Sequence, residues 1–306
     1  MKTAVEIKDL TKRYGDLTAL DSISLTVNEG ELFGIIGPDG AGKSTLYQIL
    51  ATLLNPNAGS ASIFGLDTVK DYRTLRRMIG YMPEKFSLYQ DLTVQENLRF
   101  FASLFGVSVK DNFNLIAPVF GQLEKFPNRK AGALSGGMKQ KLALSCALIH
   151  RPSILLLDEP TTGVDAVSRS EFWDILHSLK ESRMTILVST SYMDEATLCD
   201  RIAMIDKGHI LKTGRPDDLI SSIGKNLWQS SAKEMFALLE EYRKMPEVID
   251  CYTFGAYLHI VADDNFNSRI VKDKLSQTFK DFELSKATGT IEDLFIKLSR
   301  ENHNVL

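Results

Sequence analysis

The sequence predicts an α/β fold whose core is a parallel sheet. Three short apolar runs, at residues 32–36, 154–157 and 185–189, have the length and composition of buried strands. Helical periodicity separates them, because apolar residues there recur every three or four positions. Strands that alternate with helices along a chain imply a parallel α/β sheet.

The first 30 residues precede this sheet and alternate apolar with polar residues, which predicts antiparallel strands. The helix after the first apolar run presents Leu46, Ile49, Leu50 and Leu53 on one face. Further helices are predicted within residues 91–130, around a break near Pro118 and Gly121, then after Ser135 and ending before Pro152, and near residues 168–180.

The pattern changes after about residue 220, where we expect a small α+β accessory or dimerisation domain of ~80 residues. We therefore divide the chain into a first domain over residues 1–222 and a second over residues 223–306. The elements predicted in the second domain are a helix over 231–244, a strand pair at 247–252 and 257–261, a helix over 268–279, and a last helix capped by Thr290.

Composition excludes several classes of protein. The 306 residues carry a formal net charge of −3, so the chain lacks the basic balance typical of nucleic-acid binding. Its three cysteines form no CxxC pair, which argues against a zinc site or a disulfide framework and favours a reducing compartment. The charged N-terminal stretch has no apolar signal core, and no run approaches the ~18 to 20 apolar residues of a spanning helix. Any role at a membrane must then come through a partner.

A glycine-rich segment after the first apolar run fits the phosphate-binding pattern G-x-x-x-x-G-K-[ST]. The glycines allow backbone N–H groups to surround phosphate oxygens, and the following helix directs its N-terminus at the same anion. Lys43 would reach the β- and γ-phosphates and Ser44 would hold Mg²⁺. The alternative, a chance glycine-rich turn, fits poorly with its place between a strand and a helix. The residues expected to bind nucleotide here are Gly37, Pro38, Asp39, Gly40, Ala41, Gly42, Lys43, Ser44 and Thr45.

Two carboxylates, Asp158 and Glu159, follow the second apolar run. Ligand sites in open α/β sheets lie at such strand ends. Asp158 would hold Mg²⁺, directly or through water, and Glu159 would orient and polarise the attacking water as a general base. The alternative is an Asp-Glu-Pro turn that merely ends a strand, which the phosphate loop upstream makes a poor explanation.

A second possible anion site lies at Ser135, Gly136 and Gly137, directly before a predicted helix. The hydroxyl can donate a hydrogen bond, and the glycines leave nearby amides bare. The simpler interpretation is an N-cap serine followed by flexible glycines. Two anion sites in one small domain are explained if the second serves a nucleotide bound to another copy.

Together these motifs resemble the ABC (ATP-binding cassette) ATPases over residues 1 to about 220. The segment LSGGMKQ, between the phosphate loop and LLLDEP, matches the family's signature. The resemblance implies a P-loop NTPase cassette with a parallel sheet core, an antiparallel β subdomain and a helical subdomain, and it implies ATPase activity with ATP and Mg²⁺ as cofactors. It also implies that Tyr14 stacks on adenine and that Asp165 lies in a loop crossing the dimer interface; an ordinary strand-end tyrosine and a simple turn are the alternatives.

The resemblance further implies partners. Two ATP molecules would lie between head-to-tail subunits, so a second ATP-binding subunit is expected, in a homodimer or a heterodimer. Dimer closure on ATP would drive an integral-membrane permease that docks on residues 81–91 and the helices after them. The chain would then be peripheral on the cytoplasmic face, with membrane contact only through the permease and no nucleic-acid partner.

The sequence departs from the family's pattern at two positions. Glu84 stands where a Gln usually senses Mg²⁺ and the attacking water, and Ser191 stands where a His usually faces the γ-phosphate. Glu84 can still accept bonds or bind metal but cannot donate an amide N–H, and Ser191 cannot span what an imidazole spans. We expect slow hydrolysis at the chain's own loop, with Ser135 and Gly137 completing a faster site on a different subunit. The alternative is a subfamily that tolerates both changes in a working homodimer.

Residues 288–295 look like the closing segment of ATPases in drug-, lipid- and polysaccharide-type exporters, which favours export. Two other classes stay open. A soluble ABC ATPase acting on ribosomes or DNA usually has two cassettes or a long coiled coil, and this chain has one cassette and no sustained heptads. A nucleotide-binding regulator with little turnover gains support from Glu84 and Ser191.

Overall fold

The structure is a computed structural model that describes residues 2–85, 87–223 and 226–303. Contacts divide the chain into two compact units, Met1–Pro216 with Ser299–Leu306, and Asp217–Leu298. This division falls six residues before the expected boundary after residue 222. The expected division into two domains stays a prediction. Among the described residues, no helix has the length and apolar character that crossing a membrane requires.

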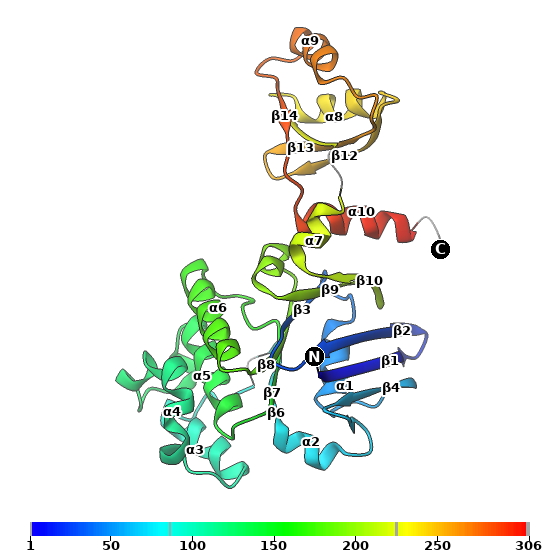
Figure 1. The fold of residues 1–306 in the computed structure, drawn as a ribbon. Helices are drawn as coiled ribbons and strands as arrows, with labels where there is room; N and C mark the ends of the chain where they lie inside the picture. Colours follow the sequence, from blue (N-terminus) through cyan, green and yellow to red (C-terminus); the bar gives the residue numbers. More distant parts are fainter. Residues whose placement is uncertain (1, 86, 224–225, 304–306) are drawn as a thin grey trace. The chain divides into compact units, whose positions relative to one another are not determined.

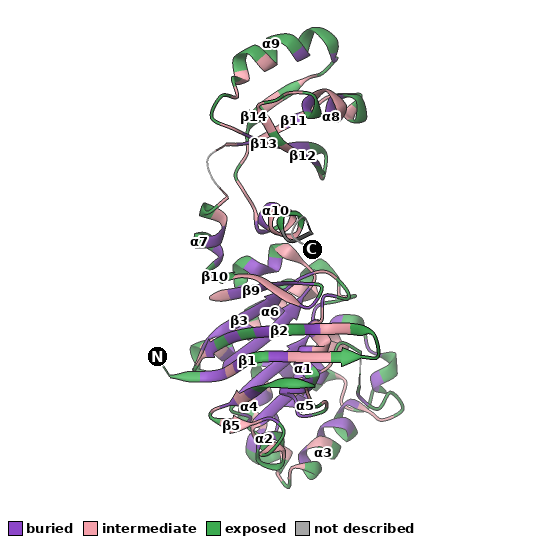
Figure 2. Cartoon of the chain, turned by 90° about the vertical axis from the view of Figure 1, so that its right-hand side faces the viewer, coloured by how far each residue is buried: buried purple, intermediate pink, exposed green. Residues whose placement is uncertain are grey.

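A six-stranded sheet forms the centre of the first unit (Figure 1). Its strand order is β10-β9-β3-β8-β7-β6, and every neighbouring pair is parallel except β9–β10. The three predicted strands are confirmed as its middle, β3, β8 and β7, and they are buried along their whole length (Figure 2). The bounds are β3 Leu32–Ile36, β6 Ile79–Met82, β7 Ile154–Asp158, β8 Thr185–Thr190, β9 Arg201–Asp206 and β10 His209–Gly214.

A second sheet of the first unit is antiparallel, with the order β2-β1-β4-β5. It confirms the antiparallel strands expected in the first 30 residues. Helix α1 packs between the two sheets, and its Leu46, Tyr47, Ile49 and Leu50 belong to one core with both of them. The bounds are β1 Thr3–Tyr14, β2 Leu17–Asn28, β4 Ala58–Ile63, β5 Leu66–Asp67 and α1 Lys43–Leu50.

The helical face predicted to include Leu53 is one turn too long. Helix α1 ends at Leu50, and Thr52 turns the chain with a positive φ of 61°. The side chain of Leu53 is therefore 59% exposed and lies outside the α1 core. The spacing of the apolar residues alone did not indicate the turn at Thr52.

Helices α3 to α6 lie on the other side of the six-stranded sheet (Figure 1). A capping box between Thr93 and Glu96 begins α3. Pro118 lies inside α4, and the predicted break falls only at the C-cap, Gly121. The bounds are α2 Tyr72–Met78, α3 Val94–Leu104, α4 Val109–Phe120, η1 Leu123–Lys125, η2 Ala131–Ala133, α5 Gly136–Leu148, α6 Ala166–Glu181, η3 Met193–Leu198 and α7 Pro216–Ser221.

The second unit is a βαββαβ arrangement of the ferredoxin-like kind, an antiparallel sheet in the order β12-β13-β11-β14. Helices α8 and α9 share a core with it that includes Leu238, Tyr242, Ile260 and Leu275. The predicted strand pair is confirmed as β12 and β13, whereas β11 and β14 were not predicted. The bounds are β11 Leu227–Ser231, α8 Met235–Arg243, β12 Val248–Phe254, β13 Tyr257–Ala262, α9 Ser268–Thr278 and β14 Glu283–Lys286.

The last helix, α10 Ile291–His303, is capped as expected. The Thr290 hydroxyl accepts the Asp293 N–H at 3.2 Å, and the Asp293 carboxylate accepts the Thr290 N–H at 2.8 Å. The same buried carboxylate lies 2.6 Å from His259 Nδ1 and accepts the Tyr252 hydroxyl at 2.9 Å. Polar contacts therefore tie the start of α10 to strands β12 and β13.

Candidate active site

The phosphate loop joins β3 to α1 and turns sharply at Gly42, whose φ is +105°. Lys43, the first residue of α1, is buried and points back along the loop. Its ammonium group donates to the carbonyls of Gly37 at 2.6 Å and Pro38 at 2.9 Å. It also lies 3.0 Å from Glu159 Oε1. Three oxygens, one of them a carboxylate oxygen, therefore hold the lysine in place.

The acidic pair lies at the carboxyl end of β7, beside the equivalent end of β8. Asp158 Oδ1 accepts the Ser189 hydroxyl at 2.7 Å, and Ser189 Oγ accepts the Glu159 N–H at 2.9 Å. Strand pairing places Asp158 opposite Ser189, 31 residues along the chain. Sequence reasoning missed Ser189. The available signal was a polar residue at the end of an otherwise apolar strand.

The carboxylate of Glu159 is held on both of its oxygens. Oε2 accepts the Thr162 hydroxyl at 2.9 Å and the Ser191 N–H at 3.2 Å, while the Ser191 hydroxyl lies 3.5 Å away. Oε1 makes the ion pair with Lys43 and, among the described residues, has no hydrogen-bond partner. The backbone at Glu159 is left-handed, with φ +51°. The structure thus brings Ser191 to the general-base candidate, and it adds Thr162, which sequence reasoning missed.

Three oxygen-bearing side chains, Ser44, Glu84 and Asp158, gather near the loop. Ser44 Oγ donates to Glu84 Oε2 at 3.5 Å. Burial raises the pKa of Asp158, and the negative charges of Glu159 and Glu84 raise it further, while hydrogen bonds from Ser189 and Ser44 lower it. A divalent cation would relieve this repulsion. Within the described ranges, no cluster of three or more His, Cys, Asp or Glu residues could hold a metal by itself. The oxygens of Ser44, Glu84 and Asp158 suit an Mg²⁺ ion that would take its remaining ligands from phosphate oxygens and water.

The raised pKa of Asp158 predicts that Asp158→Asn stabilises the protein in metal-free buffer at neutral pH. Folding raises the pKa of Asp158 above its ordinary 3.8. As pH rises from the unfolded pKa through the folded pKa, the folded state becomes less stable relative to the unfolded state. Asn removes the buried charge and still accepts from Ser189. We expect the free energy of unfolding to rise by about 1 kcal/mol in urea titrations with EDTA at pH 7, and the gain to vanish at acid pH.

Asp165→Asn is the matched control for this prediction. A backbone hydrogen bond from Ser168 lowers the pKa of Asp165, so its charged form is favoured in the folded state and Asn should not stabilise. A loss of stability in the Asp158 variant at neutral pH would contradict the unfavourable effect of burial and neighbouring negative charges on Asp158.

A cavity of about 670 Å³ opens beside the phosphate loop. Its lining includes the predicted residues Tyr14, Asp39, Gly40, Gly42, Lys43, Ser44, Thr45, Glu84 and Glu159. Tyr14 is half-exposed, with the Lys12 ammonium 5.4 Å from its ring centroid. Leu17, Thr18, Ala19 and Lys207 also line the cavity and were missed from sequence.

The signature residues do not line this cavity. Ser135 is the N-cap of α5, where its exposed hydroxyl accepts the Met138 N–H at 3.4 Å, as the simpler interpretation expected. Asp165 caps α6 and accepts the Ser168 N–H at 3.0 Å. A Cβ on Gly137 would lie 2.5 Å from Ser168 Oγ, so the two helix starts lie against each other. Gly136 also lies close to the segment before α6, since a Cβ on Gly136 would lie 3.2 Å from the Gly163 carbonyl oxygen.

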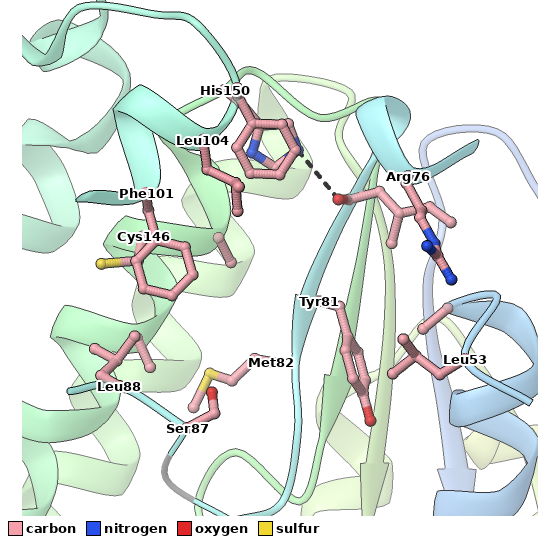
Figure 3. Close-up of a pocket in the computed structure, with 15 residues that line it drawn as sticks. Leu53, Arg76, Tyr81, Met82, Ser87, Leu88, Phe101, Leu104, Cys146 and His150 are labelled. Atoms are coloured by element: carbon pink, nitrogen blue, oxygen red, sulfur yellow. Dashed lines mark hydrogen bonds between the residues drawn. The ribbon is translucent and has the colours of Figure 1, made fainter. Parts of the chain in front are cut away.

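A separate apolar groove of about 590 Å³ lies between β6, α3 and α5 (Figure 3). Tyr81, Met82 and Leu88 come from the range predicted to dock the permease, and Phe101 and Leu104 come from α3. His150 closes one end, where its Nε2 lies 3.1 Å from the Ile79 carbonyl oxygen and its ring stacks on Phe105 at 3.8 Å. Phe86, also in the predicted range, lies outside the described residues.

Known proteins resemble this chain closely. A family model described as ABC transporter matches residues 20–162. Nod factor export ATP-binding protein I of Burkholderia thailandensis is 34% identical over 299 residues, 96% of each chain. The chain belongs to the ABC transporter ATP-binding family. The probable multidrug ABC transporter ATP-binding protein YbhF of Escherichia coli (strain K12) is 43% identical over 221 residues, which are 71% of this chain but 38% of YbhF.

Solved structures of ABC cassettes show the same fold. An ATP-binding subunit of an ABC transporter aligns with a TM-score of 0.65 at 30% identity, covering 72% of this chain and 93% of its own. A dimeric cassette in a post-hydrolysis state with ADP and Pi aligns with a TM-score of 0.62 at 30% identity, covering 69% and 98%. The chain therefore has the predicted P-loop cassette fold of the ABC ATPases.

Proposed function

We propose that this ABC ATPase binds MgATP between two ATP-binding subunits and drives export through a separate integral-membrane permease. One observation carries the proposal. Tyr14, Lys43, Ser44 and Glu159 converge on one cavity, whereas Ser135 lines none of it. Each chain then holds two half-sites, and a head-to-tail pair of subunits would complete both.

The residues of the cavity would divide the work. Lys43 would leave the carbonyls of Gly37 and Pro38 and bind the β- and γ-phosphates, with loop N–H groups around them. Ser44, Asp158 and Glu84 would hold Mg²⁺, which supplies positive charge to the phosphates when bound. Glu159 would orient and polarise the attacking water. Tyr14 would stack on adenine.

Hydrolysis at this chain's own loop is proposed to be slow. The Ser191 hydroxyl approaches Glu159 only to 3.5 Å, and its side chain is too short to pass that carboxylate toward a γ-phosphate. Glu84 adds a negative charge where a neutral amide would donate. Ser135 and Gly137 would serve a faster site on a different ATPase subunit. In the alternative, a homodimer tolerates both changes.

Restoring the usual side chains tests this assignment. We expect Ser191→His combined with Glu84→Gln to raise ATP turnover of the purified chain at least ~10-fold, because a positioned donor on the γ-phosphate side contributes on the order of 10² in rate. Phosphate release measures the rate, Lys43→Ala gives the background, and Ser178→His on the exposed side of α6 is the matched control. If the unmodified chain hydrolysed ATP fast and Lys43→Ala abolished that activity, the proposal of a slow site on this chain and a faster site on a different subunit would be wrong.

The apolar groove is the proposed docking site for the permease. Its lining of Tyr81, Leu88, Phe101 and Leu104 suits an apolar helix face from a cytoplasmic segment of that partner. This would place the chain on the cytoplasmic face of the membrane, with no lipid contact of its own. Export is favoured by the closing segment at residues 288–295 and by relatives named for Nod factor export and for a multidrug transporter.

Co-purification from detergent-solubilised membranes tests the function itself. A hydrophobic permease that comes down with the chain, and is lost when Phe101→Glu is introduced into the groove, supports transport. Ribosomes or DNA in its place would support the soluble class of ABC ATPase. ATP retained without turnover or a permease would support a nucleotide-binding regulator, for which Glu84 and Ser191 are the motivating observations.

A further inference from the structure

The turn between β9 and β10, residues Asp206 to His209, contacts the nucleotide cavity. Lys207 and Gly208 both have left-handed backbone, with φ values of 45° and 81°, as a tight two-residue hairpin turn requires. Lys207 is exposed and lines the cavity that also contains Tyr14, Ala19 and Lys43. Sequence reasoning assigned this lysine no role.

Backbone hydrogen bonds fix the turn against the phosphate loop. The Gly208 N–H donates to the Ala41 carbonyl at 3.0 Å, and the Gly208 carbonyl accepts the Asp21 N–H at 3.0 Å. The approach is so close that a Cβ on Gly208 would lie 2.9 Å from the Ala19 carbonyl oxygen. The position of Lys207 is therefore tied to the same loop that would hold the phosphates.

The other end of the turn is held by the last helix. Asp206 is buried, and its Oδ2 accepts the Ser299 hydroxyl at 2.6 Å. Ser299 belongs to α10 and, by its contacts, to the first unit. One hydrogen bond thus joins Ser299 to Asp206, 93 positions apart, and another joins Gly208, two residues further along the turn, to Ala41.

We propose that Lys207 is a further nucleotide-binding residue, whose ammonium contacts the phosphate chain, and that Ser299 is a positioning residue that sets it from the C-terminal helix. The inference rests on ATP being bound in this cavity as proposed above. A second cation beside Lys43 would add a charge-assisted bond to a phosphate oxygen. The ammonium can reach the phosphates because its turn is bonded directly to Ala41.

Equilibrium dialysis of the full chain with radiolabelled ATP and Mg²⁺ tests the contact. We expect Lys207→Gln to weaken ATP affinity about 5- to 10-fold, with a flatter dependence on KCl concentration, since one charged contact is lost. Lys207→Arg keeps the charge and should stay within about twofold. Lys70→Ala removes an exposed lysine that lines none of this cavity and should change nothing.

The role of Ser299 is tested by a double-mutant cycle. Ser299→Ala should weaken ATP binding about 2- to 3-fold, and this loss should disappear in the Lys207→Gln background, because the serine acts through the lysine. Ser276→Ala in α9, whose hydroxyl bonds the Asp273 carbonyl of its own helix, is the matched control. Thermal melts of each variant show whether the fold is retained.

Two results would overturn the inference while leaving the proposed function standing. In one, the unmodified chain binds ATP and Lys207→Gln binds it equally well. In the other, Ser299→Ala weakens binding by the same factor with and without Lys207, which would make the serine merely structural. If the unmodified chain retains no ATP at all, the proposed function fails, and this inference fails with it.

Discussion

Replacing Glu159 by Gln should lower ATP turnover at the chain's own site by about 10² to 10⁴-fold, the usual contribution of a positioned general base. The amide keeps the size of the side chain but cannot take a proton from water. Thr162 and the Ser191 N–H would still hold the amide oxygen in the place of Oε2. Single-turnover hydrolysis in the Ser191→His and Glu84→Gln background gives a rate high enough to measure the drop.

The same substitution should make ATP bind somewhat more tightly. Glu159 is one of three oxygen partners of the buried Lys43 ammonium, and Gln removes the only charged one. Glu195→Gln is the matched control, because Glu195 is also buried near the site and accepts from Thr161 but lines none of the cavity. If Glu159→Gln left turnover unchanged, or weakened ATP binding as much as turnover, its assignment as the base would be wrong.

Gly42→Ala should abolish measurable ATP binding, a loss of at least ~100-fold, and destabilise the fold by about 3 kcal/mol. Its φ of +105° lies where L side chains are strained, and the new Cβ would lie 2.4 Å from the Ala19 carbonyl oxygen. That carbonyl belongs to β2, which is paired along its length with β1, so it cannot move aside cheaply. The start of α1 would be displaced, and with it the Lys43 ammonium.

Gly40→Ala provides the contrast within the same loop. Gly40 also has a positive φ, 79°, but a Cβ there meets nothing within 4 Å. We expect it to cost about 1 kcal/mol of backbone strain and to reduce ATP affinity by less than ~10-fold. Urea unfolding and equilibrium dialysis of both variants give the comparison. Equal losses in the two would show that backbone freedom, and not the contact with β2, sets the requirement for glycine.

Local pattern was enough to predict the strands that carry the site. Strands β3, β7 and β8 are buried on both sides of the sheet. Because such strands need apolar residues at nearly every position, their short apolar runs could be predicted as buried strands from the sequence. β6 was missed because it is only four residues long and contains a glycine, Gly80, where a Cβ would lie 2.6 Å from the Ala147 carbonyl oxygen. The need for that glycine comes from helix α5 packed against the strand, and no feature near residue 80 reveals it.

The sequence by itself determined where Lys43, Ser44, Asp158 and Glu159 lie, because glycines and charged residues at fixed spacing after buried strands leave few other conformations or uses. Only the tertiary structure decided what surrounds them. Ser189 and Thr162 hold the acids, Lys207 lines the cavity from a hairpin distant in sequence, and Ser135 does not line it. These contacts depend on which strands and turns become neighbours. Packing across the whole sheet decides this, and such long-range packing produces no periodic pattern in the sequence.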